Sequence, residues 1–177
     1  MIIIKSYVTL KTKFWQRGVN ILAKEKRFWV LLALTLAWIL FIFSNSMQIA
    51  EDSSEASAGI VEWLMGILKR YSISLNLDFL TFVVRKCAHF TEYLVLGALT
   101  SATVQIRKQN ISSRIIRILF TIMTVALCDE TIQLFTDGRS SEVRDVWIDV
   151  AGGITGLLLA ALIVWVNGRL RQKKQRA

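Results

Sequence analysis

Long runs of apolar residues constrain this chain more than any other feature of its sequence. Residues 28–43 are sixteen consecutive positions without a charge, and residues 152–166 are fifteen more. Two further stretches, 88–104 and 115–135, are nearly as apolar. A helix needs about 20 mostly apolar residues to cross the hydrocarbon core of a bilayer, and each stretch reaches that length with its flanks. The sequence therefore predicts an all-α integral membrane protein.

The pattern predicts a polytopic protein with four transmembrane helices, at about residues 28–47, 81–104, 115–135 and 146–166, and with interfacial helices. Residues 1–27 alternate basic and bulky apolar side chains, which suits a helix in the membrane interface. After the first span, apolar residues recur at helical spacing from Ile60 to Leu68, which predicts a short helix or a lid on the outer surface. Asn76 or Asp78 can cap the next helix, and residues 136–141 read as a turn.

The net charge of +9 is distributed as a topology signal. Sixteen of the 22 Lys and Arg residues lie before the first expected span, in or beside the second connection, or after the fourth span. Twelve of the 13 acidic residues border the other two connections. This alternation follows the positive-inside rule. We therefore expect both termini in the cytoplasm, with a basic amphipathic segment at 1–27, a membrane domain at 28–166 and a basic tail at 167–177.

A nucleic-acid partner is not expected, because no basic patch is interleaved with exposed aromatic residues. A cleaved signal peptide usually has an apolar core of about 7–15 residues. The first core here has sixteen residues and a 27-residue leader, so we favour a retained anchor. Cys87 and Cys128 both fall toward the outer side, where a disulfide can form, but we favour two separate thiols packed in helices.

Polar residues inside the expected spans indicate a functional site. Arg85, His89 and Glu92 are spaced by four and three residues, which puts them on one stripe of a helix. A charged side chain at the bilayer centre costs about 2.5–3.5 kcal/mol on insertion scales. Such residues are therefore expected to face one another, water or a ligand.

Under the expected topology, the polar residues of three spans lie at the same level beneath the outer surface. Gly152 and Gly156 let the fourth helix pack closely on a neighbour, which brings Asp149 within reach of the second or third helix. One pocket opening to the outer leaflet would satisfy the whole set. The predicted binding pocket comprises Arg85, Lys86, His89, Glu92, Tyr93, Asp129, Glu130, Gln133, Arg139, Asp145 and Asp149.

This set allows more than one kind of chemistry. His89 is the only histidine and can act as a general acid or base. In an enzyme, Glu92 would orient His89, and Glu130 or Asp149 would bind a metal or water. His89, Glu92, Asp129, Glu130 and Asp149 also offer the mixed nitrogen and oxygen ligands that suit a divalent metal.

A structural role is the alternative. Arg85 could pair with Glu92 or an aspartate, and Arg139 could pair with Asp145, simply to hold the bundle together. Replacing buried ion pairs by apolar residues is often neutral or stabilising. A set of polar residues larger than packing requires therefore favours a functional pocket.

The same residues resemble a known family. Residues 85–93 (RKCAHFTEY), followed by Gly97, look like the R-K-x-x-H-F-x-E-Y…G signature of VanZ-like membrane proteins. A second block of that family is similar to D-E-x-x-Q-x-F at 129–135, Gly-Arg at 138–139, Asp-Val at 145–146 and G-x-x-x-G at 152–156. Asp137 stands where an apolar residue or proline is expected, and Asp149 where members often have asparagine.

The resemblance covers about residues 28–166 and implies a role at the outer face of a bacterial cytoplasmic membrane, because the family is associated with resistance to teicoplanin-type glycopeptides. We expect the pocket to bind a membrane lipid, a lipid-linked cell-wall precursor or a lipoglycopeptide. The rival hypothesis is an intramembrane hydrolase or transferase acting on a lipid head group, with His89 and Glu92 as acid–base residues and a possible divalent metal. A third is lipid transport or flipping, which would need an oligomer.

Overall fold

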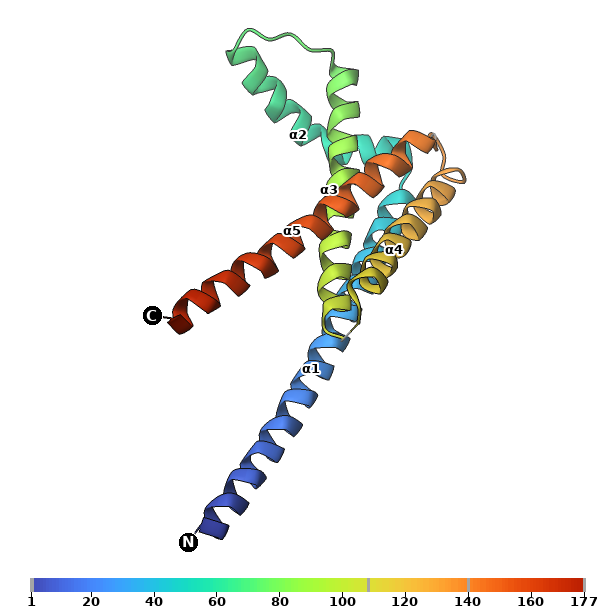
Figure 1. Ribbon diagram of the computed structural model, residues 1–177. Helices are drawn as coiled ribbons and strands as arrows, with labels where there is room; N and C mark the ends of the chain where they lie inside the picture. Colours follow the sequence, from blue (N-terminus) through green and yellow to red (C-terminus); the bar gives the residue numbers. More distant parts are fainter. Residues whose placement is uncertain (1, 108, 140, 177) are drawn as a thin grey trace.

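The computed structural model of the chain describes residues 2–107, 109–139 and 141–176, with side chains from residue 21 onward except at 50–54, 56 and 176. Within these ranges it is all-helical, as predicted (Figure 1). Lys108 in the basic second connection and Ser140 in the predicted turn lie outside the described residues. The five helices are α1 (Ile2–Ser46), α2 (Ala50–Arg70), α3 (Leu77–Gln105), α4 (Ile111–Gln133) and α5 (Val143–Arg176).

Helix α1 is longer than one membrane span. The sequence predicts an interfacial helix over 1–27 and a separate start of the span at Phe28, whereas α1 runs through both without a break. At 1.5 Å per residue its 45 residues extend about 68 Å, about twice the thickness of the hydrocarbon core. The amphipathic side chains predicted for positions 1–20 lie outside the described part.

Among the residues whose side chains the structure describes, three helices are long and apolar enough to cross a membrane: residues 21–46 of α1, all of α4, and residues 143–175 of α5. Many of their large apolar side chains, such as Leu40 and Leu158, are exposed on the chain itself, as expected where lipid replaces water. These helices indicate a multi-pass membrane protein. Helix α3 has 29 residues but carries the polar stripe, and it is not among the three; a fourth span stays a prediction.

The connection after the first span is helical, as predicted, and forms α2. Asn76 caps α3, as predicted, by accepting a hydrogen bond from the backbone N–H of Asp78 at 2.8 Å. Helix α2 packs on the first half of α3 through a small buried cluster of Val61, Leu80 and Val84. The two helices therefore form a hairpin beside the rest of the bundle.

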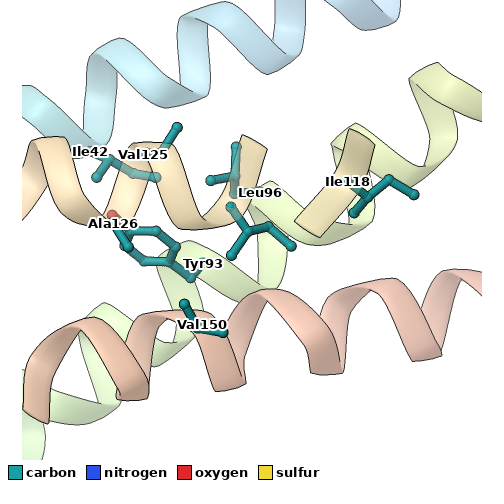
Figure 2. Close-up of a cluster of buried hydrophobic side chains, with 8 residues drawn as sticks. Ile42, Tyr93, Leu96, Ile118, Val125, Ala126 and Val150 are labelled. Carbon is teal, nitrogen blue, oxygen red and sulfur yellow. The ribbon is translucent and has the colours of Figure 1, made fainter. Parts of the chain in front are cut away.

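The main hydrophobic core draws residues from α1, α3, α4 and α5. Tyr93 and Leu96 of α3 are fully buried, and they pack with Ile42 of α1, Ile122 of α4 and Val150 of α5. Figure 2 shows the Tyr93 ring extending from α3 toward α4. Helix α3 is therefore the central helix, surrounded by the three apolar ones.

Glycines bring α3 and α5 into backbone contact. A Cβ at Gly156 would lie 1.9 Å from the carbonyl oxygen of Leu94, and one at Gly152 would lie 2.3 Å from that of Phe90. The reciprocal position on α3 is Gly97, whose added Cβ would lie 2.0 Å from the carbonyl oxygen of Gly153. The predicted close packing at Gly152 and Gly156 is confirmed, and its partner is α3.

The connection between α4 and α5 is a turn, as predicted. Gly138 has a φ of 72°, the left-handed region that favours glycine. The turn directs Arg139 back toward the end of α1. Figure 1 shows the end of α1, the end of α4 and the start of α5 at one level of the bundle, while the far ends of α1 and α5 extend away from it.

Candidate functional site

A cavity of about 700 Å³ lies between α1, α2 and α3, beneath the α4–α5 turn. Its wall is mostly apolar, with Trp38 and Phe41 from α1 and Ile60 and Leu64 from α2. Helix α2 thus forms one side of the cavity, consistent with the predicted lid. The polar lining residues include Asn45, Gln48, Ser57, Arg85, His89, Thr91, Glu92 and Arg139.

The polar stripe of α3 faces this cavity. Arg85, His89 and Glu92 all line it, which confirms that their spacing puts them on one side of the helix. Cys87 also lines the cavity, and Cys128 lies on α4; both are free thiols, as predicted, but both are exposed rather than packed.

Glu92 joins α3 to α1. Its Oε1 accepts a hydrogen bond from Asn45 Nδ2 at 2.7 Å, and its backbone carbonyl accepts one from Trp38 Nε1 at 2.9 Å. The enzyme hypothesis assigns Glu92 the role of orienting His89, whereas the hydrogen bonds found for Glu92 join it to α1. Asn45 and Trp38 were not among the predicted site residues.

Arg139 closes the end of α1. Its Nη2 donates to the carbonyl oxygen of Asn45 and its Nε to that of Gln48, both at 3.1 Å. Carbonyls at a helix C-terminus lack intrahelical partners and carry partial negative charge, so a guanidinium stabilises them. Partial burial lowers the pKa of Arg139 below its usual value, and the positive charge of Arg85 adds to this effect. The charges of Asp129, Glu92 and Glu130 oppose it only in part. The guanidinium stays charged at neutral pH.

Behind the cavity wall lies a second group of polar residues, the buried cluster of His89, Asp129 and Asp149. His89 Nδ1 is 3.7 Å from Asp149 Oδ1 and 3.9 Å from Asp129 Oδ2. Both aspartates are fully buried, whereas the His89 side chain is 15% exposed and also lines the cavity. The imidazole therefore stands between the cavity and the two carboxylates.

The two aspartates differ in their hydrogen bonds. Asp129 accepts a bond from Ser46 Oγ and another from Gln133 Nε2, the latter at 3.2 Å. Within the ranges that the structure describes, neither carboxylate oxygen of Asp149 has a hydrogen-bond partner, and neither does His89 Nδ1. Asp149 reaches the cluster because the glycines one turn later bring α5 against α3.

Lys86, Asp145 and Glu130 were also predicted for the pocket, but their side chains form bonds between helices or to the α4–α5 connection. Asp145 forms an ion pair with Lys86 and not with Arg139, which corrects one of the predicted pairings. Glu130 accepts hydrogen bonds from Ser141 Oγ at 2.7 Å and the backbone N–H of Glu142 at 3.0 Å, tying α4 to the residues before α5.

Tyr93 belongs to the hydrophobic core and does not line the cavity. Arg85 has no hydrogen bond or ion pair within the ranges that the structure describes, so the other predicted pairing, with Glu92 or an aspartate, is not formed there.

The single pocket expected from the sequence is therefore divided into a cavity and a buried cluster that share His89. The ligand atoms of His89, Asp129 and Asp149 lie within 4.8 Å of one another. The metal candidates Glu92 and Glu130 lie outside this group, because their carboxylates bond to α1 and to the α4–α5 connection.

The chain matches the family model described as VanZ/LLP1 over residues 29–164, most of its length. No curated protein and no solved structure matches it. The matched range contains the cavity, the buried cluster and the glycine contact between α3 and α5. By this match the chain belongs to the VanZ-like family.

Proposed function

We propose that the cavity binds an amphiphilic cell-envelope molecule with an anionic head group. The observation that carries the proposal is the combination, in one cavity, of two guanidinium groups with aromatic and aliphatic walls. Guanidinium groups form bidentate, charge-assisted hydrogen bonds with phosphate and carboxylate. The walls from α1 and α2 suit the apolar part of the same molecule.

Arg85 is the residue best suited to hold the head group. It lines the cavity, and no hydrogen bond or ion pair within the described part of the chain occupies its guanidinium. Arg139 is partly engaged by backbone carbonyls of residues 45 and 48 and leaves fewer donors for a ligand. The ligand class includes membrane lipids, a lipid-linked cell-wall precursor and a lipoglycopeptide.

This binding would take place in the outer leaflet of the bacterial cytoplasmic membrane. We propose that α3 is a fourth span, enclosed by the three apolar helices, and that both termini are cytoplasmic. The basic termini and the direction in which α1 and α5 extend from the cavity level support this topology (Figure 1). By binding a wall precursor or the acyl tail of the drug, the protein would contribute to resistance to teicoplanin-type glycopeptides.

Binding can be measured on the full chain in lipid nanodiscs, with a lipid-linked wall precursor as the probe and tryptophan quenching as the signal. Arg85→Gln removes an unpaired charge, and a hydrogen bond to a charged group contributes about 1.5–3 kcal/mol. We expect a loss of affinity of about tenfold or more. Ala88→Trp should also block binding by filling the cavity. Arg144→Gln is the matched control, because Arg144 lies outside the cavity. Equal affinity in all four proteins would contradict the proposal.

Resistance can be tested in a susceptible Gram-positive host that expresses each variant at equal level. Wild type and Arg144→Gln should raise the inhibitory concentration of teicoplanin, whereas Arg85→Gln and Ala88→Trp should not. A glycopeptide without an acyl chain separates the two ligands. If the tail is bound, only teicoplanin is affected; if a wall precursor is bound, both drugs are.

A hydrolase or transferase acting on a lipid head group is the second candidate, and the position of His89 favours it. The imidazole is on the cavity wall, and the carboxylates of Asp149 and Asp129 lie 3.7 and 3.9 Å from its Nδ1, so a histidine next to buried acids reaches the cavity and can act there as an acid or base. An enzyme should lose about 10²–10⁴-fold in turnover in both His89→Ala and His89→Gln. A binding protein should retain most of its affinity in His89→Gln. Lipid flipping by an oligomer stays a prediction.

A further inference from the structure

The buried cluster of His89, Asp129 and Asp149 has an unbalanced charge. Both aspartates are fully buried, and in the described part of the chain neither forms an ion pair with a nearby lysine or arginine: Lys86 pairs with Asp145, Arg139 donates to backbone carbonyls, and Arg85 lines the cavity. Isolated carboxylates in a low-dielectric interior are strongly unfavourable unless a cation or a proton compensates them. Some further group is therefore needed to neutralise the cluster.

Three buried polar atoms of this cluster lack hydrogen-bond partners within the described part of the chain. Among the described residues, His89 Nδ1 and both oxygens of Asp149 have no hydrogen-bond partner, and His89 Nδ1 lies 3.7 Å from Asp149 Oδ1 and 3.9 Å from Asp129 Oδ2. Buried polar atoms are nearly always paired, so an unpaired set marks a missing partner. An imidazole nitrogen without a proton and two carboxylates are all acceptors, which a cation can satisfy at the same time.

The spacing suits a single ion. Two ligands about 2.1 Å from one metal in tetrahedral or octahedral geometry lie ~3–3.4 Å apart. The two His89-to-aspartate separations of 3.7 and 3.9 Å need only small side-chain movements to reach that value. One imidazole with two carboxylates is the donor set of borderline divalent metals such as Zn²⁺ and Mn²⁺. A neutral imidazole, two carboxylates and a divalent ion also sum to zero charge.

The surroundings of Asp129 resemble the support that metal ligands receive in proteins. Ser46 Oγ from α1 and Gln133 Nε2 from α4 both donate to its carboxylate and fix its orientation. Replacing residues that orient a ligand in this way typically lowers metal affinity or activity about 10–100-fold. We propose that His89, Asp129 and Asp149 bind one divalent transition-metal ion that joins α3, α4 and α5 behind the wall of the cavity.

The metal site is independent of what the cavity binds, so the two proposals can fail separately. The experiment uses the full chain in detergent, without a polyhistidine tag, stripped with a chelator and then equilibrated with micromolar Zn²⁺ or Mn²⁺. Bound metal per chain is measured by elemental mass spectrometry, and thermal unfolding by intrinsic fluorescence, for which the chain has six tryptophans.

We expect one ion per chain in the wild type and an increase in its unfolding temperature with metal. Asp149→Asn and His89→Gln should each lower the affinity at least about tenfold and abolish the metal-dependent shift. Asp149→Asn removes a buried charge, so it should not destabilise the stripped protein. Glu142→Gln is the matched control, since this carboxylate is exposed and pairs with Arg144.

Three results would overturn the site. The first is a wild type that binds no metal, which is expected if a proton shared by the carboxylates neutralises the cluster instead. The second is that Asp149→Asn and His89→Gln bind metal as tightly as the wild type does. The third is that Glu142→Gln loses the ion as Asp149→Asn and His89→Gln do, which would locate the bound ion on the surface. If the metal site is intact but Arg85→Gln binds the lipid probe as tightly as the wild type, only the cavity proposal is contradicted.

Discussion

Asp129 shows how a carboxylate can be kept inside a bundle of apolar helices. Its side chain is fully buried, and its oxygens accept hydrogen bonds from Ser46 and Gln133. Ser46 is itself buried at the last position of α1. One residue of α1 therefore fixes the position of a carboxylate on α4.

Replacing Ser46 by alanine should leave this carboxylate without one of its donors. Hydrogen bonds to charged groups contribute about 1.5–3 kcal/mol, and for a chain of this size 1 kcal/mol shifts the unfolding temperature by about 2–4 °C. We expect Ser46→Ala to unfold roughly 3–10 °C below the wild type in a detergent thermal scan. Ser44→Ala, two residues earlier and exposed, is the control. A Ser46→Ala protein as stable as Ser44→Ala would show that the bond is not formed.

The ion pair of Lys86 with Asp145 should matter more for stability than an exposed pair. Its side chains are 20% and 7% exposed, against 64% and 42% for Arg144 and Glu142. Removing one partner of a buried pair costs about 3–5 kcal/mol, whereas an exposed pair contributes about 0–1 kcal/mol. We expect Lys86→Met to approach the lower end of the first range in a thermal scan, and Arg144→Gln to have little effect.

The double variant Lys86→Met with Asp145→Leu tests the cause. Buried ion pairs can be replaced by apolar residues at little cost, so this variant should recover most of the lost stability. If the double variant is as unstable as Lys86→Met, packing of the lysine stem, and not the unpaired aspartate, explains the loss.

At the scale of the helices, the contact between α3 and α5 determines the geometry of the whole site. The Cβ of Gly156→Ala would lie 1.9 Å from a backbone oxygen of α3, so the helices have to separate. Overpacking typically costs about 1–3 kcal/mol and occasionally more. We expect Gly156→Ala to lower the unfolding temperature by several degrees, measured in the same thermal scan.

Gly168→Ala is the matched control for this prediction, because it makes the same substitution in the same helix. An added Cβ at Gly168 meets nothing within 4 Å, and alanine is favoured over glycine in a helix by roughly 0.5–1 kcal/mol. This variant should be as stable as the wild type or more so. Equal behaviour of the two glycine variants would contradict the backbone contact.

The helices themselves could be predicted from the sequence because hydropathy, caps and glycine spacing are local signals. The continuity of α1 could not: the change from basic to apolar at Phe28 alters the environment of a helix, but no proline interrupts its hydrogen bonds. The division of the site also depends on helix rotation. Neighbours such as Asp129 and Glu130 lie about 100° apart on a helix, so one faces the buried cluster and the other the α4–α5 connection.

At the scale of the whole molecule, the number of spans determines which side of the membrane the termini occupy. Helix α3 carries Arg85, Lys86, His89 and Glu92, yet it is enclosed by α1, α4 and α5 and buries Tyr93 and Leu96 among them. Lipid-facing helices need an apolar surface, but a central helix can carry polar residues that face the bundle or a cavity. We therefore expect α3 to cross the membrane.

The C-terminus distinguishes four spans from three. With the N-terminus in the cytoplasm, four spans return the C-terminus to the cytoplasm, whereas three spans leave it outside. Green fluorescent protein fused after Ala177 should fluoresce, and alkaline phosphatase fused there should be inactive. Fusions after Asn110 should behave in the same way, because four spans put the α3–α4 connection inside. Fusions after Asp137 should show the opposite pattern. An active phosphatase at both Asn110 and Ala177 would show that α3 does not span, and would remove the basis for an outer-leaflet cavity.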